Sequence, residues 1–183
     1  MTTESNIQTK TEEPWLRGTL TEFPAAIRAV LHALESAKED IERWCASLTD
    51  EELNARPSGL APIAFHLRHM GRSADRLLTY AEGNSIGENQ IAQLKAEMNP
   101  GATRSELFAE LNSRFATNSA RVRSFSAESL DEPRNVGRKK LPTSVGGLLV
   151  HVADHTQHHV GELIITSKVV LAQRPLSDSR DLD

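Results

Sequence analysis

Four long stretches of the chain carry apolar residues at steps of three and four, the spacing that places them on one face of an α-helix. These stretches run from about Glu22 to Leu48, Pro62 to Glu82, Thr103 to Phe125 and Val145 to Ala172. The positions between the apolar residues are mostly charged or polar, so each predicted helix has one face to bury. The pattern therefore predicts four amphipathic helices, each roughly 20–28 residues long.

Local signals support the ends of these helices. Pro24 falls in the opening turn of the first helix, the one place where proline is well tolerated, and Gly83 follows the end of the second. Thr103 with Glu106 three residues later forms a capping box at the start of the third. The predicted boundaries thus rest on capping chemistry as well as on periodicity.

Strands contribute little to the predicted fold, since strict alternation is absent and only Asn135–Leu141 resembles a short extended piece. Four amphipathic helices with no sheet to cover are best closed as an all-α, single-domain four-helix bundle. The linker Asn84–Ala102 between helices two and three is long and has room for a short helix at about Glu88–Glu97. Its length favours a crossover connection rather than a hairpin.

The bundle is expected to span residues 15–174, between a polar tail at 1–14 and a frayed tail at 175–183. The chain carries 21 Lys and Arg against 25 Asp and Glu, a net charge of −4, which argues against nucleic acid or an anionic membrane as partner. The longest apolar run, Leu148–Val152, is far below the ~20 residues that span a bilayer. Neither nucleic acid nor a membrane is therefore expected as a partner.

The single cysteine, Cys45, excludes an intrachain disulfide and a cysteine-rich zinc site. The polar N-terminal stretch resembles neither a secretory signal nor a transit peptide. Both features predict a cytoplasmic protein, and any bound metal must be held by nitrogen and oxygen atoms.

Four of the seven histidines lie within nine positions of the predicted fourth helix, in the stretch H-V-A-D-H-T-Q-H-H-V-G-E-L that begins at His151. At 100° per residue, His155 and His159 fall in the apolar seam and lie one turn apart, close enough for two imidazoles to share one ion. His151 continues this row towards its edge, whereas His158 points away to solvent. The seam consists of Leu148, Val152, His155, His159, Leu163, Thr166 and Val170.

Buried imidazoles need hydrogen-bond partners or a metal, because an unsatisfied polar group in a core costs several kcal/mol. One such histidine is commonly a satisfied core residue, but two in successive turns of one seam favour a divalent metal. A third ligand is expected from the second helix, which offers His66 near the centre of its apolar face and His69 at the margin. His32 lies off the apolar stripe of the first helix and is expected at the surface.

Three segments together resemble the DinB-like superfamily of four-helix-bundle metal proteins. They are S-L-T-D-E-E-L-N-A-R-P after the first helix, P-I-A-F-H-L-R-H at the start of the second, and the histidine-rich stretch of the fourth. The resemblance covers about residues 22–172 and implies a bacterial protein with three histidine ligands. That superfamily includes bacillithiol transferases and mycothiol-dependent maleylpyruvate isomerases, and its members often form homodimers.

Carried onto this chain, the resemblance makes His69, His155 and His159 the metal ligands, with His66 as the alternative third ligand favoured by the helical wheel. Glu162 stands where the family often has glutamine. It is a candidate catalytic base, a candidate hydrogen-bond partner of a ligand, or an exposed acid with no role.

Three imidazoles leave at least one coordination position open, which is typical of a catalytic site, and they suit Zn²⁺ or Ni²⁺. The resemblance implies a transferase that adds a low-molecular-weight thiol to an electrophilic small molecule. Arg138, Lys139 and Lys140 are weak candidates for contacts with carboxylates of such a thiol. Two other interpretations stay open: a metal-binding or stress-related bundle without turnover, and histidines that only fill the core.

Overall fold

The computed structural model describes residues 12–174, and most of these residues are helical. Two 3₁₀ turns, η1 (Pro14–Leu16) and η2 (Pro57–Gly59), and one two-stranded hairpin, β1 (Pro133–Val136) with β2 (Leu141–Ser144), complete the described part. Its six α-helices are α1 (Ala25–Cys45), α2 (Asp50–Asn54), α3 (Ile63–Ala81), α4 (Glu88–Lys95), α5 (Arg104–Arg123) and α6 (Val145–Ala172).

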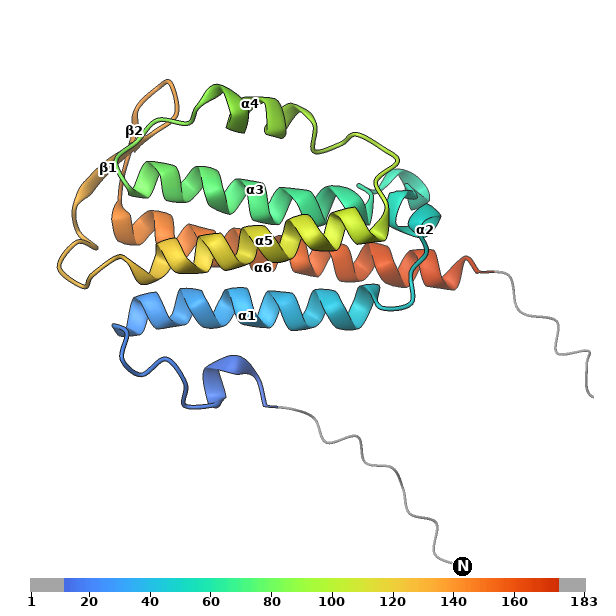
Figure 1. Ribbon diagram of the computed structural model, residues 1–183, viewed down its shortest axis with the longest axis horizontal. Coiled ribbons are helices and arrows are strands. Elements are labelled where there is room, and N and C mark those ends of the chain that lie inside the picture. The colour runs from blue at the N-terminus through green and yellow to red at the C-terminus, as the bar shows by residue number, and fades with distance from the viewer. Residues whose placement is uncertain (1–11, 175–183) are drawn as a thin grey trace, which may run out of the picture.

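The four long helices α1, α3, α5 and α6 lie side by side along the longest axis of the molecule (Figure 1). They correspond to the four helices that periodicity predicts, and the prediction of a mostly helical fold is confirmed. The short helix α2 and the hairpin were not among the four predicted elements. The predicted terminal tails lie outside the described residues, apart from residues 12–14.

The connection between α3 and α5 is the predicted crossover. Both helices run in the same direction, with Arg72 paired to Glu110 at 2.7 Å and Asp75 paired to Arg121 at 2.6 Å farther along both helices. The linker returns along the outside of α3 and carries α4 within it, as Figure 1 shows. This path brings the end of the linker back to the first half of α3.

Helix α4 is held mainly by polar contacts, because none of its residues is buried. Arg72 donates to the backbone carbonyl of Gln93 at 2.9 Å, and Gln90 donates to the carboxylate of Asp75 at 2.8 Å. The side chains of α3 therefore determine where the crossover lies. Glu97, just beyond α4, is thereby placed next to His69 of α3.

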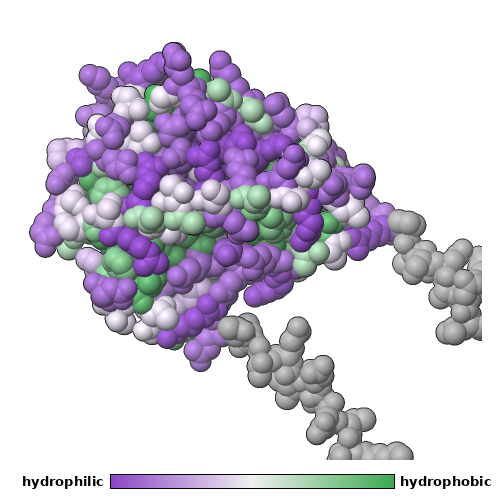
Figure 2. Space-filling view, viewed as in Figure 1, coloured by the Kyte–Doolittle hydropathy of each residue, from purple (hydrophilic) through white to green (hydrophobic). Residues whose placement is uncertain are grey.

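Apolar side chains fill the space between the four long helices. The predicted seam of α6 faces this core, since Leu148, Val152, Leu163 and Val170 are all at most 5% exposed. In the view of Figure 2, hydrophilic residues cover most of the surface and hydrophobic residues show mainly along the boundary between α1 and α5. No helix in residues 12–174 has the length and apolar character needed to cross a membrane.

The capping predictions agree with the structure. Thr103 precedes α5, its side chain accepts from the backbone N–H of Glu106, and the Glu106 carboxylate accepts from the backbone N–H of Thr103. Pro24 immediately precedes α1. The expected extended piece at Asn135–Leu141 is part of the hairpin, but its centre is the turn between the strands rather than a strand.

The prediction that His32 is a surface residue is wrong. Its exposure is only 6%, and its Nε2 lies 3.1 Å from the hydroxyl of Thr19. The chain before α1 folds back along that helix (Figure 1), and Thr19 of this segment contacts the His32 ring. Periodicity within α1 could not reveal this, because the covering segment lies outside the helix.

Candidate metal centre

Four histidines meet where α3 faces α6. The Nε2 atoms of His69 and His155 are 2.9 Å apart, and the ring centroid of His159 lies 4.5 Å from the centroid of each of these two rings. One nitrogen from each of His69, His155 and His159 falls within 4.8 Å of the other two. These three side chains could therefore share one ion with little rearrangement.

Helix geometry explains this convergence. His155 and His159 are one turn apart on α6, and His66 and His69 are three residues apart on α3, so each pair projects from the same side of its helix. The two helices are antiparallel, and His69 meets His155 while His66 meets His159. His69, predicted at the margin of the apolar face, is half-buried and points between the helices.

Glu97 holds His69 from the crossover. One carboxylate oxygen, Oε2, accepts from Nδ1 of His69 at 2.6 Å, and the other, Oε1, accepts from Arg76 at 2.8 Å. With the proton on Nδ1, the lone pair of His69 lies on Nε2, which faces His155. A carboxylate behind a histidine ligand is a common feature of metal sites, where it sets the tautomer and the ring orientation.

The charge of Glu97 is stabilised although the side chain is 2% exposed. Burial alone would raise its pKa, but the hydrogen bonds from His69 and Arg76 outweigh burial and leave the pKa below its usual value. Glu97 is a residue that the sequence analysis missed. It is 28 positions from His69 in the chain, and no local pattern marks it.

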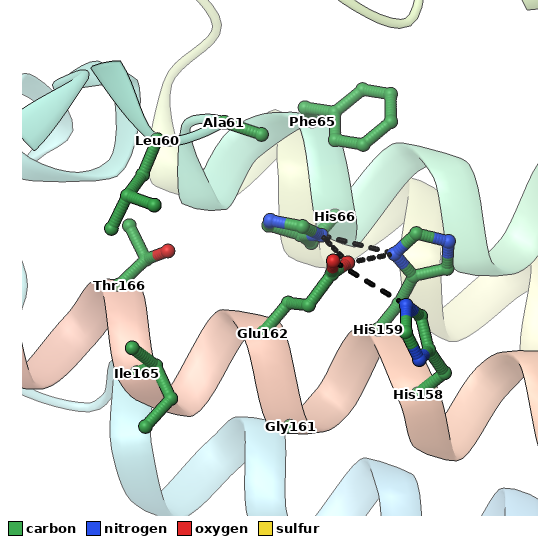
Figure 3. Close-up of a pocket in the computed structure, with 10 residues that line it drawn as sticks. All are labelled: Leu60, Ala61, Phe65, His66, His158, His159, Gly161, Glu162, Ile165 and Thr166. Atoms are coloured by element: carbon green, nitrogen blue, oxygen red, sulfur yellow. Dashed lines mark hydrogen bonds and ion pairs between the residues drawn. The ribbon is translucent and has the colours of Figure 1, made fainter. Parts of the chain in front are cut away.

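A second group of donors shares His159 with the first. Nδ1 of His159 lies 2.7 Å from Oε2 of Glu162 and 3.3 Å from Nδ1 of His66, and the Glu162 oxygen is 3.6 Å from His66 (Figure 3). Glu162 also lies 3.4 Å from His158, which is 65% exposed, as predicted for a solvated residue. The structure thus places Glu162 against the histidines, although its side chain is 46% exposed.

Three of the clustered imidazoles, those of His66, His155 and His159, favour the neutral form. Burial, reinforced by neighbouring histidines, lowers the pKa of His66 and of His155 to about 4, despite the opposing charge of Glu162 near His66. Burial also lowers the pKa of His159. A neutral imidazole has a free lone pair at pH 7, which is the form that binds a metal ion.

Phe65 is a second residue that the sequence analysis missed. Its ring stacks on His69, with the centroids 5.0 Å apart and the planes at 21°, and its edge contacts His66 at 5.2 Å. Because it touches histidines on both sides, Phe65 restricts the planes of their rings. An aromatic residue at this position was visible in the sequence, but only packing shows which rings it meets.

The histidines lie between two pockets. The larger, of about 480 Å³, is lined by Leu60, Ala61, Phe65, His66, His158, His159, Gly161, Glu162, Ile165 and Thr166 (Figure 3). The smaller, of about 250 Å³, is lined by His69, Ser73, Arg76, Leu77, Tyr80, Ile86, Leu94, His151 and His155. A small molecule can therefore approach the histidines from either end of the α3–α6 boundary.

The three loop cations do not reach the histidines. Arg138, Lys139 and Lys140 lie in the exposed turn between β1 and β2, and none of them lines either of the two pockets. Lys140 instead lines a separate cavity with Tyr80. The reason is topological, because the hairpin joins α6 at its beginning and turns away towards α4 (Figure 1), whereas His155 and His159 lie farther along α6.

A family model, that of the DinB superfamily, matches residues 33–163, which contain the four clustered histidines, Glu97 and Glu162. The chain belongs to the DinB superfamily. The predicted resemblance is thereby confirmed, and the histidine cluster of this DinB-superfamily protein is compatible with metal binding.

Among solved structures, the chain is similar to a conserved protein from Enterococcus faecalis known from a crystal structure, with a TM-score of 0.65 and 18% sequence identity. The similarity covers 79% of this chain and 96% of the other. At this identity the likeness shows a common fold alone. No curated protein matches the chain.

Proposed function

We propose that this DinB-superfamily protein holds a divalent metal ion, Zn²⁺ or Ni²⁺, on His69, His155 and His159, and transfers a small thiol to electrophilic substrates. The observation that supports the proposal most directly is the convergence of three imidazoles from two helices, next to a buried carboxylate and open to pockets. Membership of the superfamily supports it as well.

The donor set fits such an ion. Three imidazole nitrogens suit Zn²⁺ and Ni²⁺, and three protein ligands leave room for water or substrate, as in catalytic rather than structural zinc sites. Bound there, the metal would lower the pKa of a coordinated water or thiol and so supply a nucleophile near neutral pH.

The geometry favours His69 over His66 as the third ligand. Nε2 of His69 faces Nε2 of His155 at 2.9 Å, and Glu97 occupies the other ring nitrogen of His69. His66 instead turns its Nδ1 towards Glu162 and Nδ1 of His159. We therefore keep His66 as the alternative ligand and place it beside the reacting molecules.

The thiol must come from outside the protein. Cys45 is the single cysteine of the sequence, it is fully buried, and burial raises the pKa of its thiol to about 11. In the proposed reaction the sulfur forms a bond to carbon as the carbon–carbon double bond opens, and the thiol proton ends on the adjacent carbon. Glu162, nearly half exposed beside His159, is the group of this chain best placed to carry that proton.

The proposal is tested by metal analysis of the purified protein and by assays of thiols with electrophiles that carry an activated double bond. His155→Ala and His159→Ala are expected to abolish metal retention, and His158→Ala, which changes an exposed histidine of the same helix, is the matched control. Equal metal content in all three variants would contradict the assignment to α6.

A second function, metal binding without turnover, is favoured by the placement of the three histidines on two different helices. An ion held there would link α3 to α6 and stabilise the folded state, since it binds only that state. A stoichiometric metal, a thermal midpoint lowered by chelation and no thiol conjugation would together favour this function. A cytoplasmic location and dimerisation stay predictions from the sequence.

A further inference from the structure

We propose that the larger pocket between α3 and α6, here called the α3–α6 pocket, binds an electrophile with an uncharged and mainly apolar body, and that it disfavours carboxylates. The proposal rests on the proposed function, because it names the class of substrate for that site. Its evidence is separate, since it concerns the walls of the pocket and not the three metal ligands.

Most of the wall is apolar. Leu60 and Ala61 come from the segment before α3, Phe65 from α3, and Ile165 from α6, and these side chains surround the pocket in Figure 3. Leu60 and Ile165 remain 39% and 55% exposed, so their apolar surface is available to a ligand. A volume of about 480 Å³ lies within the range of roughly 300–1,000 Å³ that is usual for small-molecule sites.

The histidines and the carboxylate of the pocket are gathered at one end. His66, His159 and Glu162 lie together, whereas Ile165 and Thr166 continue along α6 away from them (Figure 3). A ligand that fills the pocket therefore lays its apolar part along Ile165 and turns its reactive end towards His159.

The charge of the wall disfavours anions. Glu162 is the charged acidic residue of the lining, and no lysine or arginine is among the ten residues that form it. A carboxylate in the body of the substrate would lose water without gaining a cationic partner and would be repelled by Glu162. The loop cations that could have offered such a partner lie in the hairpin turn, outside the pocket.

The test uses two fluorescent probes with the same ring skeleton, uncharged N-phenyl-1-naphthylamine and its sulfonate analogue 1-anilinonaphthalene-8-sulfonate. Titrations of the metal-free full-length protein are expected to show one site that binds the uncharged probe about tenfold more tightly than the anionic one. Glu162→Gln should reduce this preference to about threefold or less, because it removes the charge and keeps the shape.

Two variants locate the site. Ala61→Phe should weaken binding of the uncharged probe by about tenfold or more, because it fills the pocket, whereas Ala116→Phe, on the exposed face of α5, should leave binding unchanged. Gly161→Leu provides a second block, since a Cβ at Gly161 meets no atom within 4 Å and the helix can keep its backbone. Loss of binding in both blocked variants supports the proposal.

Equal affinity for the two probes, or unchanged binding in Ala61→Phe and Gly161→Leu with a normal circular dichroism spectrum, would overturn the proposal. Neither outcome affects the metal content or thiol conjugation that test the proposed function. Conversely, a protein that binds no metal but retains a selective probe site would refute the proposed function and leave the pocket assignment intact.

Discussion

Replacing Glu97 by glutamine tests how the crossover controls the candidate metal centre. The carboxylate accepts two hydrogen bonds, from His69 at 2.6 Å and from Arg76 at 2.8 Å, in a site where Glu97 is 2% exposed. A glutamine of the same length has one accepting oxygen and one donating amide. Its single oxygen can therefore accept the hydrogen bond from His69 or the one from Arg76, but not both.

Either orientation of the glutamine has a cost. If its oxygen accepts from Arg76, the amide faces Nδ1 of His69, and the proton of that ring must move to Nε2, the nitrogen that faces His155. If its oxygen accepts from His69, the amide faces the guanidinium of Arg76, whose side chain is 12% exposed and has little access to water. The first orientation removes a metal ligand, and the second leaves a partly buried cation without its partner.

The expected magnitudes follow from these two costs. Loss of the carboxylate behind a histidine ligand weakens metal affinity by about 10- to 100-fold in comparable sites. Loss of one partner from the buried Arg76–Glu97 pair should lower the free energy of unfolding of the metal-free protein by about 2–4 kcal/mol. For a chain of this size that corresponds to a fall in the thermal midpoint of roughly 5–15 °C.

The assay is competitive Zn²⁺ titration against a chromophoric chelator, combined with thermal unfolding of the metal-free protein. Glu162→Gln is the matched control, because it neutralises the other carboxylate that touches a histidine of the cluster. Its side chain is 46% exposed, so water can replace it and both effects should be smaller. Equal losses in the two variants, or wild-type affinity in Glu97→Gln, would refute the assignment of Glu97 as the residue that orients His69.

Three further predictions follow from the same structure. His69→Ala should weaken Zn²⁺ binding more than His66→Ala, and the reverse order in the same titration would make His66 the third ligand. Gly71→Ala should lower the thermal midpoint, because the new Cβ would lie 2.8 Å from the Cβ of Arg114 on α5. In the control Gly161→Ala the new Cβ meets no atom within 4 Å, and the thermal midpoint should rise because alanine favours a helix over glycine by up to about 1 kcal/mol. The metal-free protein should lose stability as the pH falls from 6.5 to about 4. In the folded protein the pKa of His66 is lowered to about 4, so over this range His66 binds a proton in the unfolded chain but not in the folded one. A free energy of unfolding that stays constant over this pH range, measured by chemical denaturation, would contradict the reasoning.

Periodicity along the chain was enough to predict the four long helices and the direction in which His155 and His159 project. Both follow from the geometry of a single helix, in which residues one turn apart share a face whatever the rest of the protein does. The capping box at Thr103 was predictable because it depends only on residues that are neighbours in the sequence. The crossover was predictable because it depends on the length of the linker between two helices.

Contacts between distant segments were beyond this reasoning. The helical wheel favoured His66, and packing shows that both histidines of α3 face α6 but that His69 is the one beside His155. The covering of His32 also depends on where the preceding segment folds.

The support that Glu97 gives to His69 depends on the path of the crossover, which brings together residues 28 positions apart. Hydrophobic periodicity reports which side of an element is buried and carries no information about which partner lies there. The sequence by itself therefore determined the helices and their histidine-bearing faces. The tertiary structure decided how those faces meet, because that depends on the packing of all four long helices together.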